Sequence, residues 1–218
     1  MVPVFGGCYS PIMIRKFDMG TALLLIDVQI GVDDLSHWGG VMGRRNNPDA
    51  EKKMLELLTK WRTLGFPVAF TQHDSVESNS PLKLNLPTGR QKPGFEIQTG
   101  DIAVTKNVNN GFIGTSLQDD LNGCGVNRLV VVGFFTNMCV EATVRMAGNL
   151  GYDTYLVPEC CATTNRLGPD GFDYDPEVIH TITVANLHGE FCTSLSPYVA
   201  EGLLSGDNID LNRVQGNE

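Results

Sequence analysis

Short, continuous runs of apolar residues alternate along the chain with longer segments in which apolar positions recur every three or four residues. The runs end in polar residues or glycine, which is typical of strands that are buried on both faces of a parallel sheet. Six such strands are predicted, at residues 21–26, 67–70, 102–105, 128–132, 154–157 and 190–195. Because strands alternate with helices, the pattern indicates an α/β fold whose sheet is covered on both faces.

The segment between the first two strands carries the clearest helical pattern. Asn47 and Pro48 have the residue types of a helix cap and a first turn. Apolar residues then recur from Met54 to Leu64, and Gly65 follows as a stop signal. We therefore predict a helix that is capped by Asn47 and ends before Gly65.

Residues 75–100 form a long segment with no clear period. Its prolines at positions 81, 87 and 93 and its glycines at 89, 94 and 100 break any regular element. Loops of this length in a compact domain are usually lids or binding loops. Disorder is the alternative, and the apolar Phe95 and Ile97 favour a packed loop.

The strand at residues 128–132 leads through Gly133 into a sharp turn and a predicted helix with Cys139 in its first turn. A helix N-terminus places unpaired N–H groups and the positive end of the helix dipole near the thiol. Both favour the thiolate, so Cys139 is a candidate nucleophile. The alternative is that Cys139 is a small buried apolar residue, which is the usual fate of a free cysteine.

Two further polar residues stand at the ends of predicted strands. Asp27 comes directly after Ile26, and Lys106 follows the strand at residues 102–105. The carboxyl ends of parallel strands meet at one edge of the sheet, where ligands bind in such folds. Asp27 could take a thiol proton, Lys106 could hold anionic groups in place, and Cys139 could attack an electrophilic carbon. Capping or packing roles would scatter these residues between both edges, so their common edge predicts a reactive site.

Composition limits the possible binding partners of the protein and its cellular compartment. The net charge of −9, with no basic block, argues against a nucleic-acid or anionic-membrane partner, and no apolar run is long enough to span a membrane. The six cysteines show no C-x-x-C spacing, which suits reduced thiols in the cytoplasm better than disulfides or a zinc site. We expect residues 1–20 to be an N-terminal extension, without the pattern of a signal peptide, that packs on a neighbouring subunit. Residues 21–218 are expected to form a single domain.

Three motifs resemble the isochorismatase-like cysteine hydrolases, and the likeness extends over roughly residues 21–198. The motifs are Leu25-Ile-Asp27-Val-Gln29, Thr105-Lys106-Asn107 and Val132-Gly133-x-x-Thr136-x-x-Cys139-Val140. The resemblance implies a three-layer α/β/α, Rossmann-like fold built on a six-stranded parallel sheet, in line with the six apolar runs. It also implies a catalytic triad of Asp27, Lys106 and Cys139.

The same resemblance implies a mechanism. A cis peptide between Phe134 and Phe135 would aim the backbone N–H groups of Phe135 and Cys139 at one point, as an oxyanion hole. Asp27 would deprotonate Cys139, and the thiolate would attack an amide or imide carbonyl. Asp27 would then return the proton to the departing amine and activate water to hydrolyse the thioester, while Lys106 acts as an electrostatic and positioning residue.

Two departures from the family pattern narrow the expected reaction, metal content and substrate. The isochorismatases that name the family do not use a nucleophilic cysteine, so Cys139 favours an amidohydrolase over an enzyme that cleaves a vinyl ether. The nicotinamidase branch carries an Asp-x-His metal motif where this chain has His73, Asp74 and Ser75. We therefore expect no metal, no cofactor and a substrate other than nicotinamide. His73 is expected to be a structural or loop residue.

The resemblance leaves the substrate open. We expect a small carbamoyl, amide or lactam-like compound, with Trp38 and Phe134 as candidate pocket walls. Relatives are usually homo-oligomers whose neighbouring subunits help to close the site, and the same is expected here. Two alternatives are a non-catalytic binding or scaffold protein and a thiol redox protein. The intact triad disfavours the first, and the lack of a resolving cysteine at C-x-x-C spacing disfavours the second.

Overall fold

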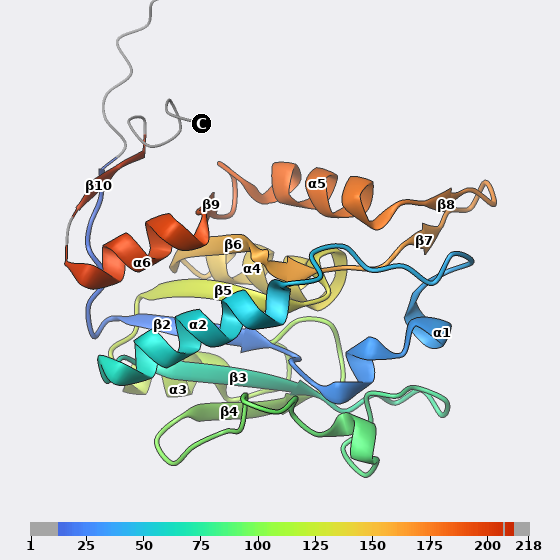
Figure 1. The fold of residues 1–218 in the computed structure, drawn as a ribbon. Helices are drawn as coiled ribbons and strands as arrows, with labels where there is room; N and C mark the ends of the chain where they lie inside the picture. Colours follow the sequence, from blue (N-terminus) through green and yellow to red (C-terminus); the bar gives the residue numbers. More distant parts are fainter. Residues whose placement is uncertain (1–12, 207, 212–218) are drawn as a thin grey trace, which may run out of the picture.

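The computed structural model describes residues 13–206 and 208–211, and a six-stranded parallel sheet lies at its centre (Figure 1). The strand order is β4-β3-β2-β5-β6-β9, so the strand that comes first in this sheet, β2, lies near its middle. The strands are β2 (Thr21–Ile26), β3 (Val68–His73), β4 (Ile102–Lys106), β5 (Arg128–Phe134), β6 (Asp153–Ala162) and β9 (Thr193–Ser194). Every residue of β2 is buried, as expected for a strand that helices cover on both sides.

Helices cover both faces of the sheet and make three layers. Alternate side chains of β2 point to opposite faces, so Leu23 and Leu25 pack in one core cluster while Leu24 and Ile26 pack in another. The first face is covered by α2 (Ala50–Thr63) and α6 (Pro197–Ser205). The second face is covered by α3 (Leu117–Gly123), α4 (Glu141–Asn149) and α5 (Pro176–Leu187). The predicted α/β/α, Rossmann-like fold is confirmed.

Short elements complete the described chain. They are η1 (Ile30–Asp33), α1 (Leu35–Trp38), η2 (Pro87–Gly89), η3 (Thr136–Val140) and the antiparallel pairs β1 (Met13–Ile14) with β10 (Ile209–Asp210) and β7 (Arg166–Leu167) with β8 (Asp173–Tyr174). Within residues 13–206 and 208–211, no helix combines the length and the apolar character needed to cross a membrane.

The described part of the expected N-terminal extension packs on its own domain. Ile14 and Phe17 are buried in the core cluster beneath α2 and α6, and the Phe17 ring lies 5.5 Å from that of Trp61. The strand β1 pairs with β10 near the other end of the described chain. The expected contact of the extension with a neighbouring subunit concerns residues 1–12 as well, and these lie outside the described residues.

Two local predictions were wrong. The helix predicted between the first two strands, α2, begins at Ala50 with Asp49 as its cap, because Asn47 adopts a left-handed conformation with φ +43°. The Asn47 amide donates instead to the carbonyls of Pro158 and Cys161, 3.1 and 2.7 Å away, and so ties this loop to β6. The second concerns the strand predicted at residues 154–157: β6 ends at Ala162, five residues further along the chain, and therefore includes Cys161.

The long segment 75–100 is packed, as its apolar residues favoured. Leu82 and Phe95 are buried in the core cluster under α2. The Lys92 ammonium donates to Asp33 and Glu51 at 2.7 and 2.6 Å, which ties the segment to η1 and α2. This loop therefore forms a fixed wall beside the carboxyl ends of the strands.

Candidate active site

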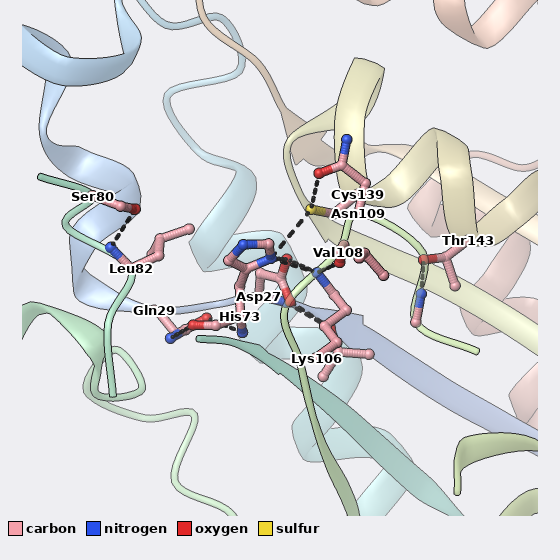
Figure 2. A network of polar contacts seen from close by, with 12 residues as sticks. Asp27, Gln29, His73, Ser80, Leu82, Lys106, Val108, Asn109, Cys139 and Thr143 are labelled. Carbon is pink, nitrogen blue, oxygen red and sulfur yellow. Dashed lines mark hydrogen bonds and ion pairs between the residues drawn. The ribbon is translucent and has the colours of Figure 1, made fainter. Parts of the chain in front are cut away.

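Asp27, Lys106 and Cys139 meet at the carboxyl edge of the sheet, as the sequence predicted (Figure 2). Asp27 follows β2, Lys106 is the last residue of β4, and Cys139 lies in η3, the π-helical turn after β5. These strands are brought together by the parallel pairing of β2 with β5 and by β3, which pairs with both β2 and β4.

The carboxylate of Asp27 is buried and fully engaged. Its Oδ2 accepts a hydrogen bond from Lys106 Nζ at 2.6 Å, and its Oδ1 accepts one from the Thr71 hydroxyl at 2.6 Å. The side chains of Asp27 and Lys106 are 1% and 0% exposed, so this is a buried ion pair. Asp27 adopts φ +51°, a left-handed conformation that Asp and Asn tolerate better than other non-glycine residues. The turn directly after β2 thus aims the carboxylate across the end of the sheet.

The Lys106 ammonium has three acceptors. They are Asp27 Oδ2 at 2.6 Å, His73 Nδ1 at 3.0 Å and the Val108 carbonyl at 3.2 Å. Burial alone would lower the pKa of Lys106, but the Asp27 carboxylate acts in the opposite sense, and the pKa lies above its ordinary value. Lys106 is therefore a fixed positive charge between Asp27, His73 and the Val108 carbonyl.

Cys139 is a buried thiol beside Asp27, Lys106 and His73, and these four side chains form the polar cluster of the site. It donates to Asn109 Oδ1 at 3.7 Å, and its sulfur lies 4.0 Å from His73 Nδ1. Burial raises the pKa of Cys139 well above the ordinary range, and the neighbouring Asp27 carboxylate raises it further, although Lys106 acts in the opposite sense. The expectation that the helix N-terminus would favour a thiolate is wrong for the resting site, because burial and Asp27 dominate. A nucleophilic Cys139 consequently needs a base, and a carboxylate oxygen of Asp27 lies within 4.8 Å of the Cys139 sulfur.

His73 belongs to the cluster, contrary to the expectation that it is a structural or loop residue. It is the last residue of β3 and pairs in register with Lys106, the last residue of β4. The sequence offered one signal for it: His73 lies three residues after the strand predicted at residues 67–70, and so near the same edge of the sheet as Asp27 and Lys106. Burial and then the Lys106 charge lower the pKa of His73, which keeps the ring neutral.

A cavity of about 320 Å³ opens onto the cluster. Asp27, His73 and Cys139 line one part of it, and Trp38, Phe134, Phe135, Met138, Val32 and Leu82 supply an apolar wall. The expected pocket residues Trp38 and Phe134 thus line the cavity, and the Trp38 ring lies 5.2 Å from that of Phe135. Exposed Arg166 and Glu77 add charges of opposite sign to the lining.

The peptide between Phe134 and Phe135 is cis, as the family resemblance implied. Phe134 is the last residue of β5, and Phe135 leads into η3, so this bond lies between the strand and the turn that carries Cys139. The ring of Phe134 lies beneath two cations, Arg45 at 5.4 Å and Lys92 at 5.6 Å from its centroid. These contacts hold one side of the cavity wall in place.

The cluster also contains the atoms of a potential metal site. The ligand atoms of Asp27, His73 and Cys139 all lie within 4.8 Å of one another. Lys106 Nζ already lies 2.6 Å from the carboxylate and 3.0 Å from the imidazole, so a positive charge occupies the place of a metal ion. Because a dication would be repelled by this ammonium, these residues do not fit a resident metal.

Comparisons with known proteins bear on the family and the fold. The model of the isochorismatase domain matches residues 21–171. The isochorismatase family protein YrdC of Bacillus subtilis (strain 168) is 37% identical over 181 residues, which are 80% of this chain and 91% of YrdC. The ureidoacrylate amidohydrolase RutB of Rhizobium rhizogenes is 29% identical over 195 residues, covering 74% of this chain and 76% of RutB.

A solved structure gives the same result for the fold. A hydrolase of the isochorismatase family from Chromobacterium violaceum ATCC 12472 superposes with a TM-score of 0.82 at 38% identity. The match covers 90% of this chain and 99% of the other. Together with the matching domain model and the YrdC relative, it confirms the resemblance that the three motifs carried. This chain belongs to the isochorismatase family and is one of its hydrolases.

Proposed function

We propose that this protein hydrolyses a C–N bond of a small amide, carbamoyl or lactam-like compound through a thioester on Cys139. The observation that carries the proposal is the buried Asp27–Lys106 pair with the Cys139 thiol beside it, where Asp27 and Cys139 line one cavity. The similarity to RutB, which is named as an ureidoacrylate amidohydrolase, supports the choice of a C–N bond.

The first half of the reaction transfers the acyl group to the enzyme. Asp27 takes the proton of the Cys139 thiol, and the thiolate attacks the substrate carbonyl carbon. The negative charge that develops on the oxygen is stabilised by the backbone N–H groups of Phe135 and Cys139. When the C–N bond breaks, Asp27 returns the proton to the departing amine.

The second half releases the acid. Asp27, again a carboxylate, takes a proton from water, and the hydroxide attacks the thioester carbonyl. Collapse of this second tetrahedral intermediate breaks the C–S bond, and the sulfur leaves with the proton held by Asp27. Lys106 keeps the Asp27 carboxyl group oriented between the proton transfers, because its ammonium lies 2.6 Å from Oδ2.

The high pKa of the Cys139 thiol suits this sequence. Since burial and Asp27 hold the resting sulfur protonated, no free thiolate is exposed to solvent oxidants before substrate arrives. The proton then moves to Asp27 as the electrophile binds. A site built for thiol redox chemistry would instead favour a stable thiolate, so a protonated resting thiol fits a hydrolase better.

The test is ammonia or amine release from a panel of small amides, ureides and carbamoyl acids. Cys139→Ala should abolish turnover, whereas Cys124→Ala, which changes an exposed cysteine, should leave it intact. Acid-quenched intact protein should show an acyl adduct that maps to Cys139. Turnover that survives Cys139→Ala, or a folded wild-type protein inactive on the whole panel, would refute the proposal.

A further inference from the structure

The ring of His73 contacts Lys106 but has no role in the proposed reaction. We propose that His73 is a positioning residue that accepts one N–H of the Lys106 ammonium at Nδ1 and is thereby fixed as the Nε2–H tautomer. Its remaining N–H then faces the cavity as a hydrogen-bond donor for the substrate. The first part stands on geometry alone, and the role towards substrate rests on the proposed function.

The contacts of Lys106 determine the tautomer. An ammonium carries three N–H donors and no acceptor. Its three partners are Asp27 Oδ2, the Val108 carbonyl and His73 Nδ1, so the imidazole can take part only with an unprotonated Nδ1. In a neutral ring the proton must then be on Nε2.

The backbone of His73 is fixed as firmly as its ring. The side-chain amide of Gln29 accepts from the His73 N–H at 2.8 Å and donates to the His73 carbonyl at 3.0 Å (Figure 2). Gln29 is buried, and its amide nitrogen also donates to the Gly89 carbonyl at 2.7 Å. This two-point contact joins the ends of β2 and β3, so the imidazole is held at a set distance from Lys106.

The side chain of His73 also borders the cavity. The His73 side chain is 13% exposed and shares the cavity lining with Cys139, and within residues 13–206 and 208–211 no hydrogen bond to Nε2 is found. An N–H placed there offers a directed donor to a carbonyl, carboxylate or leaving heteroatom of the substrate.

His73 does not act as the base for Cys139. Its Nδ1 lone pair already accepts from Lys106 at 3.0 Å, whereas the sulfur lies 4.0 Å away. Burial and Lys106 also lower the pKa of His73, although Asp27, Asp74 and Glu77 act in the opposite sense. The ring is therefore neutral while it is in contact with the ammonium, and Asp27 remains the group that takes the thiol proton.

The first test reads the tautomer without any substrate. Protein with ¹⁵N-labelled histidine gives imidazole ¹⁵N shifts that separate the two neutral forms and the cation, and His73→Asn identifies the His73 signals. We expect the pure Nε2–H form at neutral pH, and a mixture of tautomers in Lys106→Met. An Nδ1–H or cationic His73 in the wild-type protein, or an unchanged tautomer in Lys106→Met, would overturn the proposal.

The second test separates the two edges of the ring with matched variants. The amide oxygen of His73→Asn can replace Nδ1 as the acceptor for Lys106 but cannot reach the position of Nε2. His73→Gln can reach that position but supplies no acceptor at Nδ1. Losing a hydrogen bond to a charged group should lower kcat about 10- to 100-fold in His73→Gln. His73→Asn should instead raise KM about 5- to 10-fold with little change in kcat.

The outcomes are distinguishable from a failure of the proposed function. A wild-type protein with no turnover refutes the proposed function, and the tautomer measurement remains a complete test of the Lys106–His73 contact. Thermal unfolding of both variants identifies any loss of fold. If both variants fold and change kcat and KM equally, a specific positioning role for His73 is refuted.

Discussion

Replacing Lys106 by Met tests whether Asp27 and Lys106 form a buried ion pair that serves the reaction. Met fills much of the volume of the lysine stem but removes the ammonium, and so leaves Asp27 as an unpaired carboxylate that is 1% exposed. Breaking a buried pair by removing one partner typically costs about 3–5 kcal/mol. Asp27 keeps the hydrogen bond from the Thr71 hydroxyl at 2.6 Å, which places the expected loss near the lower limit.

The expected loss in the free energy of unfolding is therefore about 3 kcal/mol. For a chain of this size such a loss lowers Tm by about 6–12 °C. Lys53→Met is a matched control, because Lys53 pairs with Glu159 at 2.8 Å on the surface, with side chains 37% and 47% exposed. Breaking that pair should cost less than about 1 kcal/mol.

Urea unfolding of Lys106→Met, Asp27→Asn and the double variant at one pH gives the coupling between the two residues. Asn suits position 27 because it tolerates the left-handed φ of +51°. The double variant buries no charge, so it should recover most of the loss of Lys106→Met while remaining inactive. A loss below about 1 kcal/mol in Lys106→Met, or additive effects in the double variant, would refute the buried-pair reasoning.

Three further predictions concern pH, metal removal and a loop contact. Burial raises the pKa of Cys161 and Cys192 to about 12, so the folded chain keeps protons that the unfolded chain releases above the ordinary value of 9.0. The contribution of these two thiols to the free energy of unfolding should consequently be constant up to about pH 8, and the free energy from urea titrations should fall as the pH rises above about 9. Because Lys106 occupies the place of a metal ion, dialysis against EDTA should leave the proposed amidohydrolase activity unchanged, and its restoration by added zinc would contradict this reading. Asn47→Ala removes donors to two carbonyls and places alanine at a φ of +43°, so thermal unfolding should show a loss of about 2–4 kcal/mol, whereas Asn47→Gly should lose less because glycine adopts that conformation freely.

The fold and the common location of Asp27, Lys106 and Cys139 could be predicted from the sequence because both depend on local patterns. Continuous apolar runs define buried strands, and alternating helices force those strands to be parallel, so their carboxyl ends share one edge. Asp27 and Lys106 could be assigned to that edge because they come directly after such runs, and Cys139 because it lies in the turn that follows one. The family motifs then added the cis peptide after Phe134, which the structure contains.

The remainder depends on neighbours from distant parts of the chain. Strand order places β3 between β2 and β4, and this order brings His73 within 3.0 Å of Lys106. The protonation of Cys139 is decided by burial and by Asp27, which is 112 positions away in the chain, and not by the local helix terminus. Asn47 is likewise recruited to the carbonyls of β6 instead of capping the helix beside it. Periodicity along the sequence determines which residues reach the sheet edge, whereas burial and tertiary hydrogen bonds determine their charge, tautomer and orientation.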